Sequence, residues 1–197
     1  RNRGKVSVRK RAKGLPPSIF RLPVRQMKQG WYSDAYFVRT KHILAKDRHH
    51  PIVTMQVFCR EPATLSGVSE AIAILKLSSG RPQELKVWAL QDGDQVKPWE
   101  TVMHIVGDYA HFAHLETVYL GVLTRRTSVA TAVQEVVEAA KDKPVLFFAA
   151  RFDHFTLQPG DGYAALVAGV RAVSTNANGA WWGGEGVGTI PHGLIAA

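Results

Sequence analysis

The sequence predicts an α/β protein, with an N-terminal α+β sandwich-like domain followed by the first units of an incomplete α/β barrel. Two observations carry this prediction. In the first half, a strand-like alternation of apolar residues at 52–59 is followed by an amphipathic helical pattern at 68–75. In the second half, the apolar run 145–150 predicts a parallel strand buried on both faces. With a helical segment at 162–172 it begins an alternation of strand and helix, which is typical of a parallel sheet or barrel.

Shorter elements complete the N-terminal half. Prolines interrupt the chain near residue 20, and apolar residues then recur at roughly helical spacing up to Lys46. Apolar and β-branched residues predict two more strands, at 85–90 and 101–106. The segment between them contains Asp92-Gly93, a pair that suits a turn because it tolerates positive φ. These elements indicate a small α+β domain.

A long helix at 115–140 connects the two halves, and Lys141-Asp142-Lys143-Pro144 ends it. A closed barrel of eight strands needs roughly 200–250 residues, whereas 53 residues follow Pro144 (197 − 144). We therefore expect the N-terminal part of a longer protein. The predicted organisation is a basic tail at 1–13, an α/β domain at 14–114 and the start of a barrel at 115–197.

The charge of the chain is concentrated at one end. The formal net charge is +9, but residues 1–30 hold ten of the 25 lysines and arginines and no acidic residue, so the remaining chain carries 15 basic and 16 acidic residues. Most of the protein therefore has no excess positive field to attract phosphates, which excludes a cationic nucleic-acid binder along its whole length. No apolar run is long enough to span a membrane, and the single cysteine favours a reduced, cytoplasmic setting.

Candidate site residues follow the predicted strands of the second half. Arg151 and His154 come after the first strand, and Ser174 and Thr175 come after the second. Ligand sites in α/β folds form at these carboxyl ends of strands. An arginine there can hold a phosphate or carboxylate through its planar fork, and a histidine can relay a proton. Each residue alone could equally make a surface ion pair.

Two further segments are less specific. Trp181-Trp182-Gly183-Gly184-Glu185-Gly186-Val187-Gly188-Thr189 lacks the spacing of a nucleotide-binding fingerprint, so its glycines suit either a phosphate or a plain loop. Arg125 and Arg126 leave the long helix about 100° apart, so at least one can reach a phosphate, a neighbouring subunit or solvent.

The histidines and the cysteine indicate no metal or acyl chemistry. His49 and His50 are adjacent, and His104, His111 and His114 have no acidic or thiol partner at ligand spacing in the sequence, so we expect no metal site. Cys59 lies within a predicted strand, where it suits a small packed apolar residue.

Several blocks of the sequence, in order along the chain, resemble the nicotinate phosphoribosyltransferase family, to which quinolinate phosphoribosyltransferase is a more distant relative. The blocks are WYSDAYFVRTKHILAKDRHHPIVTMQVF (31–58), DGDQVKPWETVMHIVGDYAHFAHLETVYLGVLTRRTSVAT (92–131), FFAARFDHF (147–155), GDGYAA (160–165) and GTIPHGLIAA (188–197). The resemblance implies the transfer of a phosphoribosyl group from phosphoribosyl pyrophosphate to nicotinate, giving nicotinate mononucleotide and pyrophosphate in NAD biosynthesis. It also implies Mg²⁺, ATP as a co-substrate and a homodimer with sites at the subunit interface.

The resemblance also implies roles for particular residues. Tyr32 would stack on the nicotinate ring, and arginines would bind the carboxylate or phosphates. His154 would assist at the ribose or phosphate, and His192 would be the histidine that some members phosphorylate during ATP coupling. The implied substrate-binding residues are Tyr32, Arg126, Arg151, Ser174, Thr175 and Thr189, and the implied catalytic residues are His154 and His192. The alternative is a noncatalytic module of the same fold whose basic tail binds nucleic acid or another acidic partner.

Overall fold

The computed structural model describes residues 14–197, so the predicted basic tail at 1–13 lies outside the described residues. The N-terminal half contains η1 (Pro17–Phe20), α1 (Val24–Lys28), α2 (Ala35–Lys46), β1 (Ile52–Phe58), β2 (Ala63–Thr64), α3 (Val68–Ser78), η2 (Pro82–Glu84), β3 (Lys86–Ala89), β4 (Gln95–Val96), β5 (Thr101–Asp108), η3 (Tyr109–His111) and η4 (Ala113–Leu115). The second half contains α4 (Glu116–Ala140), β6 (Leu146–Phe147), η5 (Ala149–Phe152), η6 (Phe155–Leu157), α5 (Gln158–Ala168), β7 (Ala172–Val173), α6 (Asn176–Gly179) and α7 (His192–Ala196).

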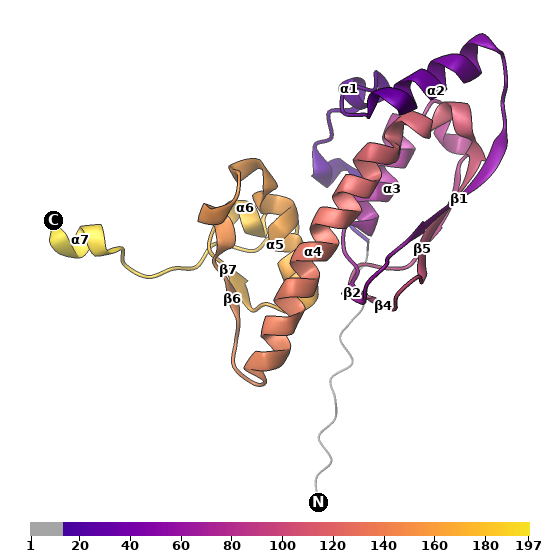
Figure 1. Cartoon of the computed structure of the whole chain (residues 1–197). Helices are drawn as coiled ribbons and strands as arrows, with labels where there is room; N and C mark the ends of the chain where they lie inside the picture. The colour runs from indigo at the N-terminus through magenta and orange to yellow at the C-terminus, as the bar shows by residue number, and fades with distance from the viewer. Residues whose placement is uncertain (1–13) are drawn as a thin grey trace, which may run out of the picture.

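The N-terminal half is built on an antiparallel sheet with the strand order β1-β5-β3, and β2 pairs separately with β4. The register of β1 and β5 sets Met55 opposite Ile105. Inward side chains of β5 pack with α3 and with the first turns of α4, so Ile105, Leu75 and Tyr119 belong to one buried cluster. Figure 1 shows α3 and α4 lying beside the strands. The predicted strand and helix at 52–59 and 68–75 are confirmed.

The second half begins a parallel sheet. Strands β6 and β7 pair in parallel, with Leu146 opposite Ala172 and Phe147 opposite Val173, and α5 lies between them in the chain. Residues 186–187 continue this edge, because Gly186 forms a parallel bridge with Val173. This strand-helix-strand unit confirms the predicted α/β class.

Three details of this half differ from the prediction. The strand expected at 145–150 spans only Leu146–Phe147, because Phe148 turns the chain (φ −115°, ψ 28°) into η5. The strand is also not buried on both faces: Leu146 is exposed, whereas Phe147 packs toward the helices. The helix expected at 162–172 spans Gln158–Ala168, because Gly169 adopts a left-handed conformation (φ 107°) that ends it.

Helix α4 links the two halves (Figure 1). Its first turns contribute Leu123 to the N-terminal core, its middle contributes Ala130 to a cluster with α5, and its last turns pack Val137 beside β6 and β7. The predicted boundary at residue 114 remains a prediction, since α4 takes part in every one of these clusters. Among the described residues, no helix is long and apolar enough to cross a membrane.

Candidate functional site

Four of the predicted substrate-binding residues line one pocket at the carboxyl ends of β6 and β7. Arg151 comes from η5, Ser174 and Thr175 directly follow β7, and Thr189 lies beyond the Gly186 bridge. The pocket has a volume of about 490 Å³. The parallel pairing explains this convergence, because the chain leaves both strands at the same edge of the sheet.

The pocket combines one cation, hydroxyl groups and apolar walls. Within residues 14–197, the Arg151 guanidinium makes no ion pair, and no hydrogen bond engages the Ser174 hydroxyl. The apolar wall consists of Phe148, Ala150, Val187, Ile190 and Pro191. A free guanidinium facing hydroxyls and an apolar wall suits a ligand with an anionic group and a flat apolar ring.

Thr175 has a structural role in this pocket. Its side chain caps α6, accepting a hydrogen bond from the Asn178 backbone N–H at 3.1 Å, and its Oγ1 lies 2.9 Å from Gln158 Oε1. Asn178 in turn donates through Nδ2 to the Gln158 carbonyl at 2.9 Å. These contacts fix the wall of the pocket between α5 and β7. Gln158 also lines the pocket and was not among the predicted site residues, although it lies among the polar residues that follow β6.

Arg126 lies outside this pocket and is already paired. Its side chain is buried, its Nε donates to Glu70 Oε2 at 3.0 Å, and its Nη1 donates to Asp161 Oδ1 at 2.8 Å. It also lies over the ring of Trp181, 5.5 Å from the centroid, at the edge of a second cavity of about 710 Å³. No pattern in the sequence indicated Glu70 or Asp161 as its partners. The role of Arg126 as a substrate ligand remains a prediction.

Its neighbour Arg125 is more exposed and binds two carboxylates. Its Nη2 lies 2.7 Å from Asp161 Oδ2 and 2.5 Å from Asp153 Oδ2. The hydrogen bonds that Arg125 donates to Asp161 and Asp153 raise the pKa of Arg125 further above its ordinary value. Glu70, Arg126, Asp161, Arg125 and Asp153 therefore form a chain of alternating charges, the charge chain, which joins α3, α4, α5 and the segment before η6.

The other predicted site residues do not line the pocket. His154 is exposed and caps η6, with its Nδ1 2.8 Å from Thr156 Oγ1. Tyr32 lies between α1 and α2, which Figure 1 shows near the opposite end of α4 from β6 and β7. His192 is the first residue of α7 and directly follows Pro191, which does line the pocket. Their catalytic and stacking roles remain predictions.

The described residues do not fit Mg²⁺ at this pocket. Mg²⁺ prefers oxygen ligands, carboxylates above all, and the pocket lining contains no acidic side chain. The acidic residues that follow β6, Asp153 and Asp161, are both bound by Arg125. One expectation about metal ligands is wrong: His111 does have an acidic partner, because its Nε2 lies 3.4 Å from Asp108 Oδ2. Asp108 and His111 are three residues apart in the chain.

Comparisons with known proteins agree with this fold. Residues 34–128 match the family model described as "Quinolinate phosphoribosyl transferase, N-terminal domain". The solved structure of nicotinate-nucleotide pyrophosphorylase from Pyrococcus furiosus is 35% identical, with a TM-score of 0.78 over 89% of this chain and 46% of that chain. Human nicotinic acid phosphoribosyltransferase is 17% identical, with a TM-score of 0.72 over 84% of this chain and 40% of that chain, and therefore shows the fold alone.

A curated relative supports the same family. The nicotinate phosphoribosyltransferase pncB1 of Mycobacterium tuberculosis is 29% identical over 101 residues, which are 51% of this chain and 22% of the relative. The chain spans less than half the length of the first solved structure and about a fifth of this curated relative.

The fold and the ordered matches make the chain a relative of the type II phosphoribosyltransferases. More specifically, residues 34–128 are similar to the N-terminal domain of the quinolinate phosphoribosyl transferase family, and α4 continues from this region into the beginning of an α/β barrel.

Proposed function

We propose that the full-length protein transfers a phosphoribosyl group from phosphoribosyl pyrophosphate to nicotinate, giving nicotinate mononucleotide and pyrophosphate, and so serves NAD biosynthesis. The observation that carries this proposal is the pocket that unites Arg151, Ser174, Thr175 and Thr189 at the carboxyl ends of β6 and β7. The likeness to phosphoribosyltransferases supports it.

The reaction joins the pyridine nitrogen to the anomeric carbon of the ribose while the bond from that carbon to pyrophosphate breaks. The anomeric carbon gains positive character, so the site must align the nitrogen with it and stabilise the departing anion. In the proposed complex, the Arg151 fork binds a carboxylate or phosphate, and the hydroxyls of Ser174 and Thr189 donate to phosphate or ribose oxygens. Phe148 and Ile190 flank the flat ring.

Replacing Arg151 with alanine in the full-length protein tests this assignment. We expect kcat/KM for phosphoribosyl pyrophosphate or nicotinate to fall by roughly 100-fold or more, because a charge-assisted hydrogen bond to a bound anion is lost. Arg171→Ala is the matched control. Arg171 is also exposed, but it precedes β7, whereas the pocket lies after the carboxyl end of that strand. Equal activity in both variants would refute the assignment of Arg151 as a substrate-binding residue.

The base preference is tested with the wild-type protein. Nicotinate, nicotinamide and quinolinate are each incubated with phosphoribosyl pyrophosphate, and the release of pyrophosphate and mononucleotide is measured. We expect the highest kcat/KM with nicotinate. Absence of product with all three bases would refute the proposed function, and a preference for quinolinate would refute the choice of nicotinate.

The same proposal includes a dependence on ATP and on Mg²⁺, which the phosphates of phosphoribosyl pyrophosphate would hold, since the pocket lining offers no carboxylate. It also includes the homodimer and the roles of Tyr32 and His192. Omission of each cofactor from the assay tests the first two. Tyr32 lies between α1 and α2 rather than in the pocket, so we propose that the partner subunit supplies it. Mixing an Arg151→Ala chain with a Tyr32→Ala chain should then restore activity, because one site of such a mixed dimer keeps both residues.

A further inference from the structure

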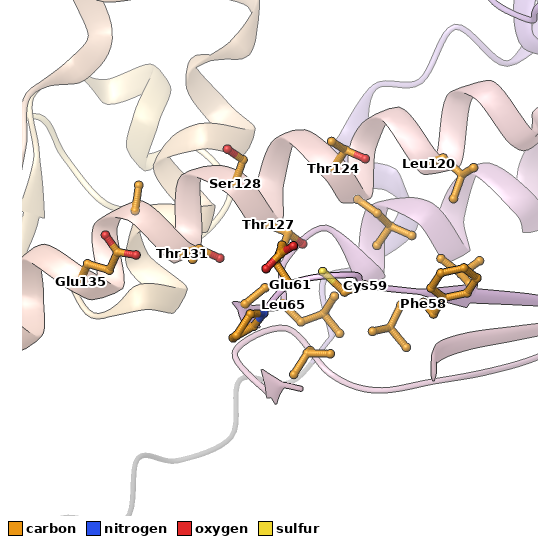
Figure 2. A pocket seen from close by; sticks show the side chains of 17 residues that line it. Phe58, Cys59, Glu61, Leu65, Leu120, Thr124, Thr127, Ser128, Thr131 and Glu135 are labelled. Carbon is orange, nitrogen blue, oxygen red and sulfur yellow. The ribbon is translucent and has the colours of Figure 1, made fainter. Parts of the chain in front are cut away.

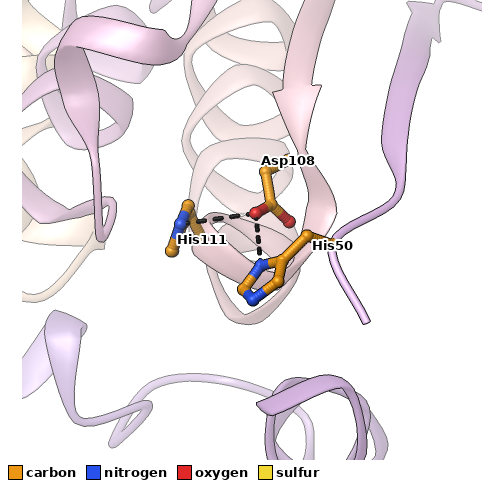
Figure 3. A group of neighbouring side chains, drawn as sticks. All are labelled: His50, Asp108 and His111. Carbon is orange, nitrogen blue, oxygen red and sulfur yellow. Dashed lines mark hydrogen bonds and ion pairs between the residues drawn. The ribbon is translucent and has the colours of Figure 1, made fainter. Parts of the chain in front are cut away.

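Three side chains with metal-binding atoms converge near the end of β5, at a distance in sequence from the pocket residues. His50 lies between α2 and β1, Asp108 is the last residue of β5 and His111 is the last residue of η3. His50 Nδ1 lies 2.7 Å from Asp108 Oδ2, and His111 Nε2 lies 3.4 Å from the same oxygen (Figure 3). One ligand atom from each residue lies within 4.8 Å of the other two.

The burial of this cluster is graded from the interior to the surface. The Asp108 side chain is 8% exposed, that of His111 is 19% exposed and that of His50 is 55% exposed. A cation can therefore reach the cluster from the side of His50 while a buried carboxylate holds it. The second carboxylate oxygen of Asp108 is already used, since its Oδ1 accepts from the Ala110 backbone N–H at 2.9 Å. This bond fixes the direction in which Oδ2 points.

His111 contributes the observation that points to a ligand. Its Nε2 is buried and makes no hydrogen bond to any described residue, although it lies only 3.4 Å from Asp108 Oδ2. A buried polar atom without a partner is costly, and a ring nitrogen this close to a carboxylate would ordinarily donate to it. A cation placed between the two atoms would satisfy both.

One of the ligand distances already matches a four-coordinate ion, and a second is within reach of it. Zinc bonds to nitrogen and oxygen are about 2.0–2.1 Å long, so two ligand atoms of a tetrahedral site lie roughly 3.3 Å apart. The 3.4 Å separation of His111 Nε2 and Asp108 Oδ2 already has this value. The separation of His50 Nδ1 and Asp108 Oδ2 would have to widen by about 0.6 Å, which the exposed side chain of His50 permits.

We propose that His50, Asp108 and His111 bind a divalent cation of the zinc class, with a water molecule or an external ligand at the fourth position. Two imidazole nitrogens and one carboxylate oxygen form a donor set that Zn²⁺, Co²⁺ and Ni²⁺ accept, whereas Mg²⁺ prefers an all-oxygen set. The bound ion joins the segment before β1 to the end of β5. His111 is also tied to the segment that follows α3, because the Gly80 backbone N–H donates to the His111 carbonyl at 2.9 Å.

The proposal is tested by titrating the metal-free full chain with Zn²⁺. Calorimetry measures the binding, and the thermal midpoint of unfolding is measured at each Zn²⁺ concentration. We expect one Zn²⁺ per chain and a rise in Tm with Zn²⁺ concentration, because the ion binds only the folded state. Four-coordinate Co²⁺ should show its intense visible bands, and excess Mg²⁺ should not displace either ion.

Two substitutions locate the site. Removing a residue that only hydrogen-bonds a metal ligand weakens metal binding roughly 10–100-fold. His50→Ala removes a ligand itself, so it should weaken Zn²⁺ binding by at least about 100-fold. The matched control is His49→Ala, which removes the adjacent, also exposed imidazole that does not belong to the cluster. His111→Ala should weaken binding as His50→Ala does.

The proposal is overturned if wild-type protein binds no Zn²⁺, or if His50→Ala and His49→Ala bind it equally. In either case the three side chains form only a hydrogen-bonded and ionic cluster. His111 is largely buried, so its substitution could prevent folding; the exposed His50 keeps the test decisive. The outcome is independent of the proposed transferase activity, since no residue of the cluster lines the pocket of Arg151.

Discussion

Two adjacent arginines in α4 are expected to differ strongly in their contribution to stability. Arg126 is 10% exposed and is bound by Glu70 and Asp161, whereas Arg125 is 37% exposed and is bound by Asp153 and Asp161. Consecutive residues leave a helix about 100° apart, so Arg126 is buried between α3 and α5, whereas Arg125 reaches Asp161 of α5 from a more exposed position. The perturbation we consider is Arg126→Gln, with Arg125→Gln as its matched control.

The expected magnitude follows from what each substitution leaves behind. Removing one member of a buried ion pair costs about 3–5 kcal/mol, because the other charge stays buried without a partner. In Arg126→Gln, Glu70 loses its only ion-pair partner among the described residues, while Asp161 keeps Arg125 at 2.7 Å. We therefore expect a loss near the lower limit, about 3 kcal/mol. In Arg125→Gln, Asp161 keeps Arg126, and exposed pairs contribute about 1 kcal/mol or less.

Urea-induced unfolding of the full chain at pH 7 measures both free energies. We expect Arg126→Gln to lose at least about 2 kcal/mol more than Arg125→Gln. Equal losses, or a larger loss for Arg125→Gln, would refute the assignment of Arg126 to a buried structural network. A normal free energy of unfolding together with a raised KM for phosphoribosyl pyrophosphate would instead support the substrate-binding role that the sequence predicts for Arg126.

Three further predictions concern the packing of single residues. Burial, aided by the nearby positive charge of a lysine, lowers the pKa of His114 from 6.5 to about 4, so between these values the unfolded chain binds more protons. Stability should thus fall by roughly 3 kcal/mol as the pH drops from 6.5 to 4, and His114→Leu should flatten this dependence in pH-dependent urea unfolding. Gly162→Ala should destabilise the protein by more than about 1 kcal/mol, because the added Cβ would lie 2.2 Å from the Asn178 carbonyl oxygen. In Gly121→Ala the added Cβ meets nothing within 4 Å, so this change should stabilise α4 by up to about 1 kcal/mol. Equal thermal midpoints of unfolding for the two variants would contradict both expectations. Asp92→Ala should cost about 1–2 kcal/mol, because Asp92 Oδ1 accepts the Val68 backbone N–H at 2.8 Å and caps α3 from a distant turn; an unchanged Tm would contradict this role.

The sequence predicted elements best where a local pattern was sufficient. Apolar alternation predicted β1, and helical periodicity predicted α3 and α4 to within a few residues. It failed at the end of β6, because an apolar run does not reveal that Phe148 turns the chain. The start of α5 was placed four residues late, since Gln158 and Pro159 were read as a loop although proline is favoured in the first turn of a helix.

Some residues of the candidate site could be predicted from local sequence patterns, and others could not. The position of residues after two predicted parallel strands was sufficient to select Arg151, Ser174 and Thr175, because strand ends meet at one edge of a sheet. Gln158 could have been found by the same reasoning, since it follows β6 among polar residues. The state of Arg126 could not, because its partner Glu70 is 56 residues away in the chain.

By itself, the sequence determined the α/β class, the order of the elements and the family resemblance, since these depend on local periodicity and on blocks of consecutive residues. Only the tertiary structure decided which charges are free and which are neutralised. Arg151 lines a pocket without an ion pair among residues 14–197, whereas Arg126 is buried between two carboxylates. His50 likewise meets Asp108 and His111 only because β1 and β5 pair antiparallel, with Ile52 opposite Asp108. Long-range pairing of this kind leaves no periodic signal in the chain.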